Sequence, residues 1–271
     1  MTVRKPSRTE ARQQRKQAKE KTLYRPPLIA RNARQAEYLE ALATRRQVFC
    51  IGPEGTAKTY LAARYGIRQV IDGTKHRLIL ARPTVSKPKH RLGYRPGDQD
   101  EKVEDWLIPI LDAVRDECGI ATIERMKNAG DISYAAFETM MGRTFHNAVV
   151  LLDEAQNCDF SDLRLFVTRQ GENTQCVVNG SLEQIGAIPD SGLAQIVDMI
   201  ERYGLDAALI KFTDEDVTRS AVTAQWVRAF RQEALRQDSL RLGASLEEDD
   251  HTGLMQMLSN SKPPDRNLAM V

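Results

Sequence analysis

Two neighbouring residues, Lys58 and Thr59, have the types and the surroundings that phosphate chemistry requires. They close the segment VFCIGPEGTAKT, in which an apolar run ends at Gly52 and a helix-like stretch begins at Lys58. Backbone N–H groups of such a loop converge on phosphate oxygens, and the following helix points the positive end of its dipole there. Lys58 is therefore expected to reach the β- and γ-phosphates of a nucleotide, and Thr59 to place its hydroxyl on Mg²⁺.

One residue departs from the usual phosphate-loop pattern G-x-x-x-x-G-K-[ST], because Ala57 stands where the pattern has a glycine. A methyl group is tolerated there if the backbone is right-handed helical, so we interpret the segment as a variant phosphate loop. Gly52 and Gly55 are expected to adopt backbone angles that a Cβ would penalise. The alternative is an ordinary glycine-containing turn that happens to precede a Lys-Thr pair.

A second candidate for chemistry is the pair Asp153-Glu154, which follows the apolar run 148–152. An uninterrupted run of this kind is typical of a strand buried on both faces of a parallel sheet. At its end, Asp153 is expected to hold Mg²⁺ through water, and Glu154 to orient or deprotonate an attacking water. Two carboxylates combined with a phosphate loop are hard to explain as helix capping alone.

The elements that must position these residues alternate along the chain. Strands are expected at 48–51, 77–82, 132–135, 148–152, 174–179 and 207–212, and helices at 30–43, 58–71, 100–118, 120–128, 161–169, 192–202 and 217–236. This alternation predicts an α/β fold with a mostly parallel sheet between helical layers and nucleotide at the carboxyl ends of the strands. Arg82 and Asn179 end two of these strands, so we expect them close to Thr59 and Asp153.

The strand 174–179 is followed by further polar residues. Asn179, Ser181 or Gln184 is expected to sense the γ-phosphate of a bound nucleotide. The alternative is an ordinary turn from a strand into a loop.

Composition excludes some classes of protein. The chain has 271 residues, of which 41% are hydrophobic and 28% charged, and no apolar run approaches the length of a membrane span. Its four cysteines are not paired as C-x-x-C and its histidines lack metal-ligand spacing. We therefore expect buried reduced thiols, a cytoplasmic protein, no membrane partner and no structural metal.

Positive charge is concentrated in two stretches. Residues 1–25 hold nine Lys/Arg against two Glu, a net charge of +7 in a chain whose total is +2. The stretch 84–98 holds four more Lys/Arg together with Tyr94. Both patterns favour contacts with RNA or single-stranded nucleic acid. The alternatives are a solubilising tail and an exposed flexible loop.

Taken together, these segments resemble the PhoH family, ATPases related to the cores of superfamily-one helicases. The resemblance runs from Asn32 to Phe230 and is carried by GPEGTAKTYLA, ARPTV, LGYRPGD, GRTFHNAVVLLDEAQN, VVNGSLEQ and FTDEDVTRSAV. It implies a RecA-like P-loop NTPase domain at 26–236 that uses ATP and Mg²⁺. A flexible basic tail (1–25) and a polar C-terminal tail (237–271) are expected to flank this domain.

The resemblance also implies roles for single residues. Gln35 falls where the family places an adenine-contacting glutamine, and Arg219 on an arginine that could act as a finger across a subunit boundary, which suggests a homohexameric ring. Lys58, Glu154 and Arg219 are expected to be catalytic, and Thr59 and Asp153 to hold the metal. The residues expected to bind ATP are Gln35, Gly52, Pro53, Glu54, Gly55, Thr56, Ala57, Lys58, Thr59, Tyr60 and Gln184. Ala57 departs from the family, and so does Asn179-Gly180-Ser181, where the family usually has Thr-Gly-Asp.

Three functions are compatible with these patterns. The first is an ATPase that acts on RNA or single-stranded nucleic acid, with a helicase-like or RNA-metabolism role. The second is a small-molecule phosphotransferase, although the Glu154-Ala155-Gln156 sequence suits water activation better. The third is a nucleotide-regulated oligomeric assembly protein with little turnover, which the two departures from the family make possible.

Overall fold

The computed structural model describes residues 27–83, 99–182 and 191–218, together with scattered helical residues between 222 and 239. For residues 99–106 it describes the backbone alone. The chain divides into two compact units, Met1–Thr218 and Arg219–Val271. The first unit contains the sheet and the candidate site. The boundaries expected at 25/26 and 236/237 stay predictions.

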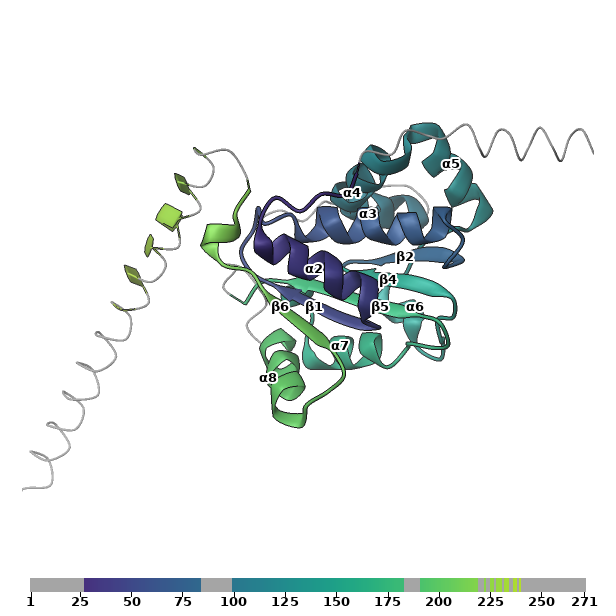
Figure 1. Ribbon diagram of the computed structural model, residues 1–271. Helices are drawn as coiled ribbons and strands as arrows, with labels where there is room; N and C mark the ends of the chain where they lie inside the picture. Colours follow the sequence, from purple (N-terminus) through teal and green to yellow (C-terminus); the bar gives the residue numbers. More distant parts are fainter. Residues whose placement is uncertain are drawn as a thin grey trace, which may run out of the picture. The chain divides into compact units, whose positions relative to one another are not determined.

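A six-stranded parallel sheet forms the centre of the first unit (Figure 1). Its strands lie in the order β3-β2-β4-β5-β1-β6, and every pairing between them is parallel. The carboxyl ends of all six strands therefore open on the same edge, which we call the carboxyl edge. The strands are β1 (Gln47–Ile51), β2 (Arg77–Ala81), β3 (Ile132–Tyr134), β4 (Ala148–Leu152), β5 (Gln175–Gly180) and β6 (Ala208–Lys211).

Helices cover both faces of the sheet (Figure 1). One layer holds α2 (Ala33–Thr44), α3 (Lys58–Ile71), α4 (Gln99–Cys118) and α5 (Ile120–Ala129), and the other holds α6 (Phe137–Met140), α7 (Phe160–Val167) and α8 (Leu193–Tyr203). The expected α/β class, with a parallel sheet between helical layers, is confirmed. The helix expected at 217–236 lies largely outside the described residues.

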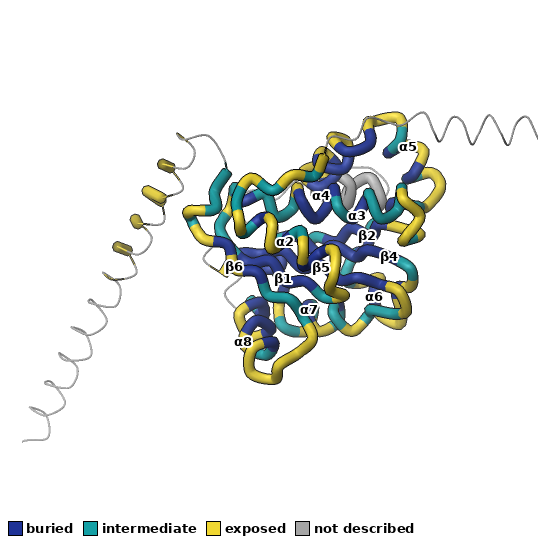
Figure 2. Tube along the Cα trace, in the orientation of Figure 1, coloured by how far each residue is buried: buried dark blue, intermediate teal, exposed yellow. Residues whose placement is uncertain are grey.

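The apolar runs are explained by burial on both faces of the sheet (Figure 2). In β4, Val149 and Leu151 belong to the core under α3, while Val150 and Leu152 belong to the core on the opposite face. All five residues of β4 are buried. Each strand begins and ends within one residue of its expected bounds. For β4 and β5, which are buried at every position, the reason is that a strand with two apolar faces leaves an uninterrupted signal in the sequence.

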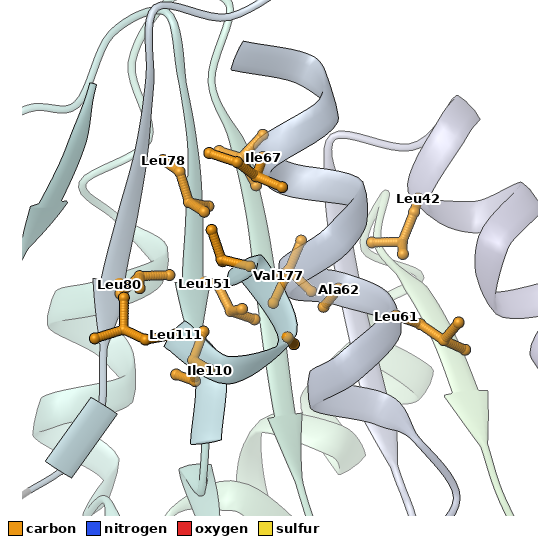
Figure 3. Close-up of a cluster of buried hydrophobic side chains, with 14 of the residues drawn as sticks. Leu42, Leu61, Ala62, Ile67, Leu78, Leu80, Ile110, Leu111, Leu151 and Val177 are labelled. Carbon is orange, nitrogen blue, oxygen red and sulfur yellow. The ribbon is translucent and has the colours of Figure 1, made fainter. Parts of the chain in front are cut away.

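The core on the first face fixes α3 against the sheet. Leu61, Ala62 and Ile67 of α3 pack over Leu78, Leu80, Leu151 and Val177 of the strands, and Ile110 and Leu111 of α4 complete the cluster (Figure 3). Complete burial of one such aliphatic side chain contributes about 1.5–3 kcal/mol. The first turn of α3, which carries Lys58 and Thr59, is thereby held at the carboxyl edge.

A buried charge cluster fixes α4 against α3. The fully buried carboxylate of Glu117 accepts hydrogen bonds from Nε of Arg64 at 2.7 Å and from Nε of Arg68 at 2.6 Å. Both arginines belong to α3, so a single carboxylate ties two successive turns of that helix to the end of α4.

Two further expectations can be compared with the fold. All four cysteines are buried and carry no disulfide, as expected for reduced thiols. Within the part of the chain that the structure describes, no helix is both long enough and apolar enough to cross a lipid bilayer.

Candidate active site

The loop of residues 52–57 joins β1 to α3, and close packing explains its first glycine. Gly52 has φ 154°, and a Cβ there would lie 2.5 Å from the Cβ of Phe212 and 2.7 Å from its carbonyl oxygen. Gly55 also has a positive φ, of 85°. Both glycines therefore meet the conformational need that the sequence indicated.

Ala57 corrects one expectation. The sequence interpretation required a right-handed helical backbone at this position, but the residue has φ 69° and ψ 21°, in the left-handed region. An L-residue with a Cβ is disfavoured there by about 1–2 kcal/mol. The loop thus keeps the backbone that a glycine would adopt, and the methyl group packs against the core cluster of the α3 face.

Lys58 is folded back over this loop. Its Nζ donates to the carbonyl oxygens of Gly52 at 2.8 Å and Pro53 at 2.7 Å, and to Oγ1 of Thr56 at 3.3 Å. Burial lowers the pKa of the Lys58 ammonium, while the nearby Cys50 and Asp153 act in the opposite direction. The ammonium therefore already occupies a cradle of oxygen atoms, which is the kind of partner that phosphate oxygens supply.

Thr59 and Asp153 meet directly at the carboxyl edge. Oγ1 of Thr59 donates to Oδ1 of Asp153 at 2.6 Å, and Asp153 is only 4% exposed. Burial raises the pKa of Asp153 to about 6, and the hydrogen bond from Thr59 opposes that rise. A hydroxyl and a carboxylate are the hard oxygen ligands that Mg²⁺ prefers. The two residues fit a magnesium ion.

Glu154 is held from two sides in an unusual backbone conformation. It has φ 57° and ψ 41°, and its Oε1 accepts a hydrogen bond from Nη2 of Arg82 at 3.1 Å. Its Oε2 accepts from Nε2 of Gln156, whose own Oε1 accepts from the backbone N–H of Ser181 at 3.0 Å. The sequence analysis associated Glu154-Ala155-Gln156 with water activation but did not predict these hydrogen bonds of Gln156.

Asn179 is a buried polar residue at the carboxyl end of β5, the strand next to β4. Asn179 of β5 is paired in register with Cys50 of β1, and both are fully buried. Oδ1 of Asn179 accepts a hydrogen bond from the hydroxyl of Tyr38 in α2 at 2.8 Å, whereas its Nδ2 is a buried donor without a partner. Asn179 thus lies at the carboxyl edge, as expected, but in contact with α2.

Gln35 links α2 to the phosphate loop. Its Nε2 donates to the carbonyl oxygen of Thr56 at 3.1 Å, and its Oε1 accepts from the N–H of Arg31 at 2.9 Å. Its own N–H donates to Oδ1 of the N-cap residue Asn32 at 2.8 Å, so Asn32 caps α2. The side chain is 1% exposed. Hydrogen bonds to the backbone of Thr56 and Arg31 engage both ends of the Gln35 amide group, and the contact with adenine stays a prediction.

The chain that follows β6 closes over the same loop. The N–H and Oγ1 of Thr218 donate to the carbonyl oxygen of Gly55 at 3.0 Å and 3.3 Å, and Nδ2 of Asn32 donates to the carbonyl oxygen of Asp216 at 3.3 Å. The loop is therefore enclosed by β1, α3, α2 and the segment 213–218. Sequence reasoning did not predict this contact.

The other expected site residues fall into two groups. Glu54 and Tyr60 are exposed, and the Tyr60 hydroxyl accepts a hydrogen bond from Nη1 of Arg64 at 2.9 Å. Gln184, Arg219 and the two basic stretches 1–25 and 84–98 lie outside the described residues.

A parallel sheet with a phosphate loop after β1 and an Asp-Glu pair after β4, with β5 between them, is the arrangement of a P-loop NTPase. The family model described as PhoH-like protein matches residues 27–231. The chain belongs to the PhoH family. The RecA-like P-loop fold class that the resemblance implied is thereby confirmed.

Individual relatives agree with this assignment. The chain is 33% identical over 208 residues to Protein PhoH of Escherichia coli (strain K12), a match that covers 75% of this chain and 58% of that protein. It is 37% identical over 200 residues to the PhoH-like protein of Bacillus subtilis (strain 168), which covers 72% of this chain and 61% of that protein. The chain thus spans less than two thirds of the length of either relative.

Solved structures with a related arrangement are more distant. The large terminase from a thermophilic bacteriophage superposes with a TM-score of 0.46 at 11% identity, over 70% of this chain and 47% of the terminase. The UvsW helicase from bacteriophage T4 superposes with a TM-score of 0.43 at 12% identity, over 74% of this chain and 67% of the helicase.

Proposed function

We propose that this chain binds ATP with Mg²⁺, hydrolyses the ATP, and acts on RNA or single-stranded nucleic acid. The observation that supports this best is the 2.6 Å hydrogen bond between Thr59 and Asp153. It brings the residue after the phosphate-loop lysine together with the first carboxylate of the Asp-Glu pair. A small-molecule phosphotransferase would share these two residues but would not need a second carboxylate, Glu154, to orient water.

The proposed roles follow from the positions of the side chains. Backbone N–H groups of residues 52–57 and the first turn of α3 bind the phosphates, and Lys58 exchanges its carbonyl partners for phosphate oxygens. Thr59 and Asp153 hold Mg²⁺, which neutralises charge on the phosphates when bound. Glu154 accepts a hydrogen bond from the attacking water and orients it.

Further parts of the proposal rest on sequence and on family membership. The net charge of +7 in residues 1–25 and the four Lys/Arg of residues 84–98 are suited to a polyanion. Arg219 is proposed as a finger that completes the site of a neighbouring copy in a homohexameric ring, and Gln35 and Gln184 as nucleotide contacts. The cytoplasmic location also belongs to this proposal.

Phosphate release tests the proposal most directly. We expect Mg²⁺-dependent release of phosphate from ATP that increases when oligouridylate or single-stranded DNA is added at low salt. EDTA and Lys58→Ala are each expected to abolish the release. A native mass measurement with and without ATP and Mg²⁺ reports the size of the ring.

Ser181 favours one alternative function. It stands where the family usually has an aspartate, and its N–H is engaged by Gln156. If ATP binds tightly but is not hydrolysed, with or without polynucleotide, the chain is better described as a nucleotide-regulated assembly protein.

A further inference from the structure

Both carboxylate oxygens of Glu154 accept hydrogen bonds, one from Arg82 and one from Gln156. Arg82 follows β2 and donates to Oε1, while Gln156 donates to Oε2 and is itself anchored on Ser181, which follows β5. A carboxylate held in this way has fewer free lone pairs with which to orient a water molecule. In this arrangement the Glu154 carboxylate is restrained rather than ready to orient water.

The ion pair between Arg82 and Glu154 is partly exposed, so a ligand can replace Glu154 as the partner of Arg82. The two side chains are 20% and 28% exposed, whereas those of Arg64 and Glu117 are 6% and 0% exposed. The buried pair cannot open without exposing uncompensated charge, but the partly exposed pair can change partners at low cost. Glu154 also has a strained left-handed backbone, a feature that clusters at switch regions.

The chemistry of Arg82 indicates which ligand would compete with Glu154. A guanidinium group binds phosphate oxygens with the same two-pronged geometry as it binds a carboxylate. Arg82 lies immediately after β2, at the carboxyl edge that also carries the phosphate loop. In the sequence it directly precedes Pro83 and the basic stretch 84–98.

We propose that Arg82 is a phosphate-responsive latch on Glu154. A phosphate oxyanion that binds Arg82 releases Oε1 of Glu154, which is then able to orient the water. The phosphate comes either from the polynucleotide backbone or from the terminal phosphate of the nucleotide. This inference rests on the proposed function, in which Glu154 acts on the water, and it makes Arg82 a positioning residue.

Thermodynamic linkage provides a test that needs no turnover. If Glu154 and a phosphate compete for Arg82, removal of the Glu154 charge must raise the affinity for the phosphate ligand, and removal of Arg82 must lower it. The double variant is decisive, because a latch predicts that Glu154→Gln has no further effect once Arg82 is replaced. Simple removal of a negative charge predicts instead that the two substitutions act additively.

The experiment measures the affinity of fluorescein-labelled oligouridylate without nucleotide, and of ATP and ADP without polynucleotide. We expect Glu154→Gln to tighten one of these ligands by about threefold, the scale of a partly exposed ion pair. Arg82→Gln should weaken the same ligand, and the double variant should match Arg82→Gln. An effect on oligouridylate identifies the polynucleotide as the source of the phosphate, and an effect on ATP but not ADP identifies the nucleotide.

Arg45→Gln is the matched control. Arg45 pairs with Asp206 at 3.3 Å, is 58% exposed and lies before β1, at the opposite edge of the sheet. It corrects for the loss of one positive charge, and thermal unfolding of every variant confirms that the fold is kept.

The latch is overturned if Glu154→Gln leaves the affinity for both ligands unchanged, or if its effect persists in the Arg82→Gln background. Phosphate release is measured in parallel. A chain that shows the linkage but no phosphate release refutes the proposed hydrolysis and leaves the competition for Arg82 intact. A chain that releases phosphate but shows no linkage refutes the latch alone.

Discussion

The hydroxyl of Thr59 donates a 2.6 Å hydrogen bond to Asp153, although 94 positions separate the two residues in the sequence. Their strands, β1 and β4, are not neighbours but are joined through β5. The parallel direction of all three strands brings the two residues together, since each lies shortly beyond the carboxyl end of its strand. The first two predictions concern the carboxylate in this contact.

Asp153→Asn is expected to stabilise the chain in the absence of Mg²⁺ and nucleotide. Burial raises the pKa of Asp153 from 3.8 to about 6, so the folded state disfavours the carboxylate. The cost is absent below the unfolded pKa, grows as the pH rises and is complete above about 6, where it amounts to at most about 3 kcal/mol. Urea unfolding of both proteins at pH 4 and pH 7.5 in EDTA should show a difference that appears only at the higher pH. A constant difference would contradict the shift.

The affinity for Mg²⁺ should rise with pH, whereas the stability of the metal-free chain falls. The metal requires the carboxylate of Asp153, and this form is depleted below a pKa of about 6. We therefore expect the Mg²⁺-dependent part of the ATP affinity to fall by about tenfold for each pH unit below that value. Calorimetric titrations from pH 5 to pH 8 measure this dependence. Asp153→Asn should bind with a weak affinity that does not follow the same curve.

Ala57→Gly should stabilise the chain without loss of nucleotide binding. The left-handed backbone of Ala57 costs about 1–2 kcal/mol, which glycine would avoid. The greater conformational freedom of glycine in the unfolded chain reduces this gain by about 0.5–1 kcal/mol. The net gain is expected to be up to about 1 kcal/mol. Asn173→Gly is a control, because Asn173 also has a positive φ, of 50°, but lies before β5, far from the loop. Weaker ATP binding by Ala57→Gly would show that the methyl group has a role in the site.

Glu117→Gln should be strongly destabilising. The substitution removes the fully buried negative charge that Arg64 and Arg68 share. Loss of one partner of a buried ion pair costs about 3–5 kcal/mol. Asp198→Asn is the matched control, since Asp198 pairs with Arg202 at 2.8 Å in an exposed position, where the cost is about 1 kcal/mol or less. Equal effects of the two substitutions in urea unfolding would refute the role of the cluster.

Arg219→Ala tests the proposed ring. If this arginine completes the site of a neighbouring copy, its removal should lower the ATPase rate by about 10³-fold and leave the affinity for ATP unchanged. Mixing the variant with Lys58→Ala gives the sharper measurement, because rings that contain both chains can combine one intact loop with one intact Arg219. Recovery of activity in the mixture is expected for action between subunits. An unchanged rate in Arg219→Ala alone rules out the finger.

The sequence predicted the elements of the sheet well, for a physical reason. β4 and β5 are buried at every position, and such strands produce continuous apolar runs that end abruptly at polar residues. The positions of Thr59 and Asp153 followed, because parallel strands place their carboxyl ends together.

The side-chain contacts within the site could not be predicted from the sequence. The bond between Arg82 and Glu154 depends on the register of β2 against β4 and on the left-handed backbone of Glu154, which no local pattern reveals. The conformation of Ala57 was predicted wrongly, because residue type favoured a right-handed backbone while the loop imposes a left-handed one. Gln35 was singled out for its resemblance to a family position, and its hydrogen bonds to Thr56 and Arg31 needed coordinates.

The two hydrogen bonds from Thr218 to Gly55 have a mechanical consequence. Thr218 is the last residue of the first unit, so these hydrogen bonds hold the boundary between the two units at the phosphate loop. A ligand that displaces the Gly55 carbonyl would therefore act on Thr218 directly, through these two hydrogen bonds.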